Sequence, residues 1–275
     1  MLHYQLTFGE TVNIQFKSFL HAIKAEWFRG RRTFLRYSPI LIPLATVLLL
    51  LPVAWKGIAE DTSGKATGIQ GIGFYLTVWM YFMMPMYSIL VAILSFTSEH
   101  TQCMWKHTNA QPVSGTVQIL AKHFFGWCYL ITATVTITVL TTLVLLLANL
   151  FFNVTVGFAD FNFWRITGLY CLLLIAGGIA MVSLLNVLAA RVAGFSLPAM
   201  VGFFGTLLPI FASADKKAAT FIPWTASKVL TDPVFKEVFF GSKAPVEYWW
   251  IAVPAVQVAM LLWIHSYIQK KKPLY

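Results

Sequence analysis

A short polar stretch between two apolar blocks holds the residues best suited to specific chemistry. It contains Glu99 and His100, followed by Trp105 and Lys106. A tryptophan anchor flanked by an acid, an imidazole and an ammonium group suits a protein–protein contact. The alternative is that these are ordinary solvated loop charges. Glu99-His100 does not continue into the zinc-hydrolase pattern H-E-x-x-H, so we expect contact and not catalysis.

Motifs for nucleotide hydrolysis and metal binding do not accompany this stretch. Gly64-Lys65 lacks the upstream glycine of the pattern G-x-x-x-x-G-K-[ST], which cradles phosphates in ATPases. Cys103, Cys128 and Cys171 offer neither a disulfide framework nor the spacing of a metal site. We therefore expect a chain that is not an enzyme, with no metal and no cofactor of its own, so that any ATP-driven role needs a second polypeptide.

Polar residues inside the apolar blocks could line a substrate path. Thr138 belongs to a threonine series on one face of a predicted helix, and Asn149 and Asn186 are further candidates, joined by Trp224 from the loop 214–247. The alternative is packing, because threonines often bond to their own helix backbone or to a neighbouring helix. We find no acid deep in an apolar block, which argues against proton coupling through a carboxylate.

The elements that position these residues are long apolar blocks. Hydrophobic residues make up 58% of the chain and charged residues only 11%, far below the roughly 25% charged residues of soluble domains. A helical span needs about 20 apolar residues, and backbone in lipid must satisfy its own hydrogen bonds. The sequence therefore predicts an all-α membrane protein and one transmembrane domain over 1–275, with spans near 38–56, 71–98, 119–152, 163–190, 197–213 and 248–268.

Charge predicts the orientation of these six spans. One side holds twelve basic and three acidic residues, a net charge of +9, and the other holds eight basic and seven acidic residues, a net charge of +1. Lys and Arg gather on the cytoplasmic side of membrane proteins, so both termini are expected in the cytoplasm. The formal net charge of +10 then follows from topology, and we expect no nucleic-acid partner.

Two segments outside the spans have unusual composition. Residues 11–36 predict an amphipathic helix at the membrane interface, with apolar residues at helical spacing and lysines on another face; the alternative is a simple orientation anchor.

The expected extracellular loop, 214–247, mixes aromatic residues with lysines and acids. It predicts short interfacial helices that act as a gate or receptor, or alternatively a plain aromatic belt.

The polar stretch also resembles a known family. The run from Ser98 to His107, continued by Gln111-Pro112-Val113-Ser114 and Ala121-Lys122, is similar to the region between the second and third spans of ABC-2 type permeases. The pairs Glu99-His100 and Trp105-Lys106 look most like lantibiotic-immunity permeases, the group that includes bacitracin-resistance permeases. Gly115 departs from the basic residue expected after the Pro-Val-Ser turn.

This resemblance implies an ABC-2 type transporter fold with six transmembrane helices and an N-terminal interfacial helix. It implies that 99–115 is a cytoplasmic coupling region that docks on a separate ATPase through Glu99, His100, Trp105 and Lys106. The connector helix lies beside it. Its candidate residues are Phe19, Ile23, Lys24, Trp27 and Arg31.

The resemblance also implies a function. The chain is expected to be the permease subunit of an ABC exporter in a bacterial cell membrane, where it expels an amphipathic or membrane-bound peptide antibiotic. Its partners would be cytoplasmic ATPase subunits that bind ATP and Mg²⁺, a second permease (identical or related), and membrane lipids. Two alternatives stay open: an exporter of another hydrophobic cargo, such as a lipid-linked glycan or a toxin, and a membrane sensor or scaffold that does not transport.

Overall fold

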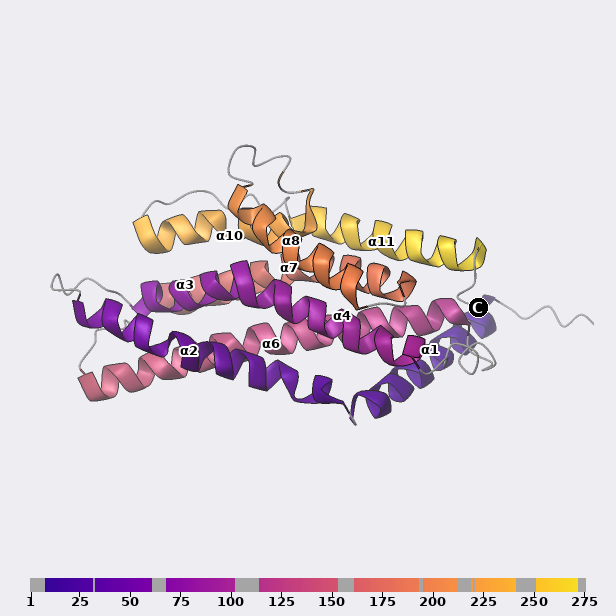
Figure 1. Cartoon of the computed structure of the whole chain (residues 1–275), viewed down its shortest axis with the longest axis horizontal. Helices are drawn as coiled ribbons and strands as arrows, with labels where there is room; N and C mark the ends of the chain where they lie inside the picture. Colours follow the sequence, from indigo (N-terminus) through magenta and orange to yellow (C-terminus); the bar gives the residue numbers. More distant parts are fainter. Residues whose placement is uncertain are drawn as a thin grey trace, which may run out of the picture.

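The apolar blocks form helices in the computed structural model (Figure 1). It describes residues 8–31, 33–60, 68–101, 114–152, 161–192, 195–211, 219, 221–240 and 251–271, and contains no strand within them. The helices are α1 (Phe8–Gly30), η1 (Phe34–Arg36), α2 (Ser38–Glu60), α3 (Gly68–Val78), η2 (Trp79–Met83), α4 (Met84–Thr101), α6 (Gly115–Phe152), α7 (Phe161–Arg191), α8 (Ser196–Phe211), α10 (Pro223–Phe240) and α11 (Ala252–Lys271).

Each of the six predicted spans coincides with a helix. Among the residues that the structure describes, three helical stretches are long and apolar enough to cross a membrane, namely Gln70–Phe96, Gly115–Phe151 and Phe161–Arg191. The other three coincide with shorter apolar helices, at Ser38–Val53, Ser196–Pro209 and Ala252–Tyr267. The helical class is confirmed, whereas the count of six spans stays a prediction.

The second predicted span is one continuous helix with a local irregularity. Helices α3 and α4 are joined by η2, a π-helix over Trp79–Met83. Pro85 lies two residues after the end of η2, and proline lacks the N–H that would bond to the carbonyl four residues earlier, so it disturbs the helical ladder there. The widened turn leaves Trp79 fully buried, and its indole N–H donates to the Thr134 hydroxyl on α6 at 3.4 Å.

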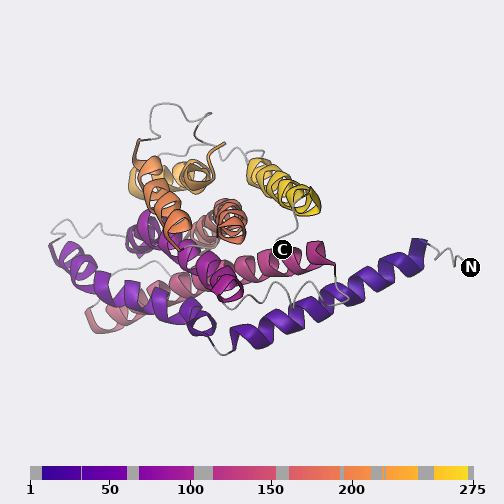
Figure 2. The ribbon, with the colours of Figure 1, turned by 45° about the vertical axis from the view of Figure 1, so that its right-hand side comes forward.

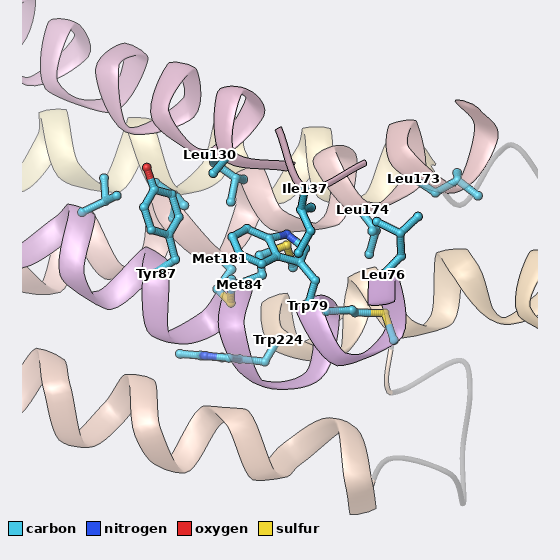
Figure 3. Packing of buried hydrophobic residues seen from close by; sticks show 14 of the residues in the cluster. Leu76, Trp79, Met84, Tyr87, Leu130, Ile137, Leu173, Leu174, Met181 and Trp224 are labelled. Atoms are coloured by element: carbon cyan, nitrogen blue, oxygen red, sulfur yellow. The ribbon is translucent and has the colours of Figure 1, made fainter. Parts of the chain in front are cut away.

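Helix α7 forms the centre of the bundle, with α4, α6, α10 and α11 packed around it. Figure 3 shows Trp79, Met84, Leu130 and Met181 gathered in the buried cluster between these helices. The glycines of α7 allow close approach: a Cβ at Gly177 would lie 2.6 Å from the backbone nitrogen of Ser227 on α10. Helices in lipid associate through small residues such as Gly177.

Helix α10 lies inside the segment for which the sequence predicted short interfacial helices. Its buried residues face the bundle, where it packs on α7, α8 and α3. Ser227 lies against Gly177, and Glu237 binds Arg165 at 2.8 Å, so α10 runs antiparallel to α7. In Figure 1, α10 and α11 follow one another along one side of the bundle. That 214–247 faces the outside stays a prediction.

Near the N-terminus, a turn separates helices α1 and α2, which together form a V in Figure 2. The predicted connector over 11–36 begins earlier, at Phe8, and its α-helix ends at Gly30. A 3-10 turn, η1, then leads into α2. Helix α1 packs on α6, which brings the connector onto the helix that follows the predicted coupling region.

We expect Gly177→Ala to destabilise the bundle by roughly 1–3 kcal/mol, because the added methyl group would collide with the backbone of α10. Thermal unfolding of the purified protein in detergent measures this. Gly168→Ala is the matched control on the same helix, since nothing lies within 4 Å of its added Cβ. Equal melting temperatures for the two variants would contradict the close contact.

Candidate functional site: the junction of α1, α4 and α6

Helix α1 is fixed to α6 by aromatic pairs. The rings of Phe19 and Phe124 meet edge to face at 6.2 Å, and those of Trp27 and Phe125 stack at 6.4 Å. Residues three and four apart share a helix face. Phe19 lies three residues before Ala22 and Glu26 lies four after it, so these three residues all face α6. Each such pair contributes about 0.5–1.5 kcal/mol beyond its buried area. The connector is therefore part of the packed structure.

A buried lysine ties the three helices together. The side chain of Lys122, on α6, is only 2% exposed. Its ammonium group lies 3.4 Å from the Glu26 carboxylate of α1 and donates to the Ser95 carbonyl of α4 at 3.0 Å. It also lies 5.0 Å above the Phe96 ring. A buried charge needs such partners, because an unpaired one costs several kcal/mol.

Glu26 is shared between two cations. The same oxygen, Oε1, accepts from Arg29 one turn further along α1 at 2.9 Å and faces Lys122 at 3.4 Å.

A partly open cleft adjoins these groups, lined by Glu26, Arg29, Gly30, Thr33, Leu35, Leu94, Ser95, Lys122, Phe125 and Tyr129. Gly30 lets α1 approach, because a Cβ there would lie 2.7 Å from the Tyr129 hydroxyl. We call Glu26, Arg29, Ser95, Phe96 and Lys122 the junction.

The junction lies next to the predicted coupling region. Glu99 and His100 fall in the last turn of α4, four and five residues after Ser95, within the helix that ends at Thr101. Their side chains lie outside what the structure describes, as do Trp105 and Lys106 altogether. A displacement of 99–101 along the helix axis would therefore reach Lys122 through a single helical turn.

The predicted connector residues divide between two faces of α1. Phe19 and Ile23 are half-buried toward α6, whereas Lys24 and Arg31 are exposed. Trp27 is both packed and exposed: its ring stacks on Phe125 of α6, and 50% of the residue remains accessible. The apolar side chains that remain exposed are Phe16, Leu20, Trp27 and Phe28. The apolar residues of the predicted connector helix thus divide between the contact with the bundle and the exposed surface of α1.

The four predicted path residues lie apart. Thr138 donates to the Thr134 carbonyl of its own helix, and Asn149, about 16 Å further along α6, is exposed. Asn186 is fully buried on α7 beside Gly126, and Trp224 packs against Gly205. Among the described residues, no hydrogen bond or ring contact joins any two of the four. The threonine bond agrees with the packing alternative.

Sequence reasoning did not pair Lys122 with Glu26. It also did not single out His123, which is fully buried beside His265. A signal was present: Lys122 and His123 are consecutive polar residues inside the apolar helix α6. Their partners come from helices 96 residues upstream and 142 residues downstream, and a single sequence gives no register between such distant helices.

The fold and the junction define a helical membrane protein whose first helix is tied to the helices flanking a polar loop. Comparison with known families identifies the class of membrane protein: residues 22–209 match the family described as ABC-2 family transporter protein. The match takes in 188 of the 275 residues, and the chain belongs to this family. It is a membrane transport subunit of a kind that normally pairs with ATPase subunits. A search of curated proteins found no match.

We expect Lys122→Met to destabilise the protein by about 3 kcal/mol, because Glu26 and the Ser95 carbonyl both lose a buried partner. Thermal unfolding in detergent measures the change. Lys24→Met removes an exposed lysine of α1 and should stay within about 0.5 kcal/mol.

A double-mutant cycle between Lys122→Met and Glu26→Gln separates this contact from general effects. We expect a coupling of about 1 kcal/mol or more between the two sites. Additive effects would contradict the ion pair.

Proposed function

We propose that this chain is the permease subunit of an ABC exporter, and that the junction transmits movement between the ATPase and the transmembrane helices. The observation that carries the proposal is the position of Lys122. It binds α4 within one turn of Glu99 and binds α1 at Glu26, in a chain of the ABC-2 transporter family. A push on the end of α4 would therefore move α1 and α6 together.

In this proposal the residues 99–115 dock on a cytoplasmic ATPase, with Trp105 as the apolar anchor and Glu99, His100 and Lys106 as polar contacts. ATP and Mg²⁺ bound by that partner supply the energy for the cycle. Movement at Glu99 passes through α4 to Lys122. The aromatic pairs of Phe19 and Trp27 then carry α1 with α6 as one body, so that the spans rock against a second permease, identical or related.

The proposed topology has six spans with both termini in the cytoplasm of a bacterial cell. It rests on the charge asymmetry of +9 against +1 and on a helix at each predicted span. The junction supports the same orientation, because it gathers Lys122 and Arg29 beside the predicted coupling region. The exposed apolar and basic side chains of α1, such as Phe16, Lys17 and Lys24, suit contact with membrane lipids.

For the cargo we propose an amphipathic peptide antibiotic that is expelled from the bilayer. Its support is the resemblance of Glu99-His100 and Trp105-Lys106 to lantibiotic-immunity permeases. Other hydrophobic cargoes, such as a lipid-linked glycan or a toxin, and a sensor or scaffold without transport are the alternatives that experiment must separate.

The coupling site is tested by co-purification of the chain from native membranes, with an ATPase assay of the complex. We expect a cytoplasmic ATPase with the wild type and loss of at least about 90% of it with the double variant Glu99→Ala/Trp105→Ala, because the docking contact is removed. Glu237→Ala/Trp263→Ala is the matched control, since these residues belong to α10 and α11. Full retention by the first variant would refute the coupling site, and no ATPase with the wild type would refute the transporter.

The cargo is tested in cells that express the chain with its co-purified ATPase. We expect the inhibitory concentration of bacitracin or of a lantibiotic to rise at least about fourfold, and to return to the vector value with Glu99→Ala/Trp105→Ala. An unchanged inhibitory concentration, together with a functional ATPase complex, would refute the peptide cargo and favour another hydrophobic substrate.

A further inference from the structure

Two fully buried histidines meet between helices that are far apart in the sequence. His123, on α6, and His265, on α11, are each 0% exposed. Their ring nitrogens Nε2 and Nδ1 lie 3.2 Å apart, and the rings meet edge to face at 5.5 Å. One ring donates the hydrogen bond and the other accepts it, so a pair of neutral histidines satisfies this geometry.

The surroundings offer no compensation for positive charge. The remaining ring nitrogens, Nδ1 of His123 and Nε2 of His265, have no hydrogen-bond partner. Arg191 is a basic residue in the last turn of α7, and α7 packs on α11. Lys122, next along α6, is turned toward Glu26 and Ser95. Within the part of the chain that the structure describes, no acid faces the pair from α6, α7 or α11.

Metal binding does not explain the pair. Among the described residues, no group of three or more histidine, cysteine or acidic side chains comes together, and Arg191 would oppose a cation. The other polar neighbour is Trp127, one turn along α6, whose indole donates to the Ser183 hydroxyl of α7 at 2.9 Å. The pair therefore belongs to a polar seam among α6, α7 and α11.

We infer that His123 and His265 form a proton-linked latch that holds the last helix, α11, against α6. When the latch is closed both rings stay neutral, because a buried, uncompensated charge is strongly unfavourable. His123 is the fifth residue of its predicted span and His265 the fourth from the end of its own, both at the predicted cytoplasmic end. When α11 separates from α6 there, the rings reach the water at the membrane surface, and a histidine exposed to water takes up a proton near pH 6.5. Separation of the two helices is thus accompanied by proton uptake.

The sign of the pH dependence follows from this linkage. Above pH 6.5 both states are neutral and the latch has its full stability. As the pH falls below 6.5 the separated state gains a proton, so the closed state is lost. Each ring that takes up a proton would make separation about 30-fold more favourable at pH 5 than at pH 8, so the two rings together contribute at most about 1000-fold. The inference does not depend on the ATPase or the cargo of the proposed function.

The test is hydrogen–deuterium exchange of α11 in the full chain, reconstituted in lipid nanodiscs and measured from pH 8 to pH 5. Rates are corrected for intrinsic exchange and referred to the middle of α6. We expect the opening of α11 in the wild type to increase by more than about 30-fold over this range, up to about 1000-fold. The variant His123→Gln/His265→Asn places amides where the bonded ring nitrogens lie, so it keeps a hydrogen bond without titration. Its opening should change less than about twofold.

His21→Gln is the control, because His21 is an exposed histidine on α1, and it should keep the full pH dependence. The single variants His123→Gln and His265→Asn give an independent reading if the double variant does not fold, since each leaves one titrating ring and should lower the dependence to at most about 30-fold. A flat profile in the wild type, or an unchanged profile in the variants, would overturn the latch.

Discussion

Burial of the Lys122 ammonium group is the constraint on which the arrangement of α1, α4 and α6 depends. A charge taken out of water must find its partners inside the protein, and here one partner comes from α1 and the others from α4. Neither helix can shift far without leaving that charge exposed to apolar surroundings. The aromatic contacts of Phe19 and Trp27 add area along the same line. An element that could have been a loose surface helix is thereby made part of the transmembrane body.

The other half of the bundle is held by a different kind of contact. Around α7, glycines remove the side chains that would keep neighbouring backbones apart. Gly177 admits α10, and on α8 Gly205 admits the ring of Trp224. In lipid the hydrophobic effect does not distinguish a buried leucine from an exposed one, so close van der Waals contact has to supply the specificity. The bundle therefore combines a charge-centred region at α1, α4 and α6 with a close-packed region around α7.

Much of the fold could be predicted from the sequence because the signal is local. Apolar blocks of about 20 residues predict helices wherever they occur. The adjacent glycines of α7 favour close contact between that helix and its neighbours. The burial of α10 was harder to predict, because the helix carries charged residues, of which Asp232 and Lys236 pair with each other, and its buried face mixes apolar residues with threonines and a serine. The connector stripe was recognised, but which of its residues face α6 depends on the angle between two helices.

The candidate site could be predicted less well, for a physical reason. Glu99 and its neighbours stand out as polar residues in an apolar chain, and that is a property of sequence alone. The pairing of Lys122 with Glu26, or of His123 with His265, depends on which helices lie side by side and in what register. Composition and periodicity determine neither. Polar residues inside an apolar helix mark where a partner is needed, and the fold decides which residue provides it.

The π-helix at Trp79–Met83 has a consequence for how this chain tolerates insertions and deletions. A wide turn of this kind carries one residue more than the α-helical repeat requires. Losing one residue there would restore regular winding and leave α4 in register with α3, so Tyr87 and Val91 would stay in the core. Losing one residue from the regular part of α4 would instead turn the rest of that helix by about 100°, and Ser95 would turn away from Lys122. The wide turn is therefore the place in this segment where a one-residue deletion disturbs the packing least.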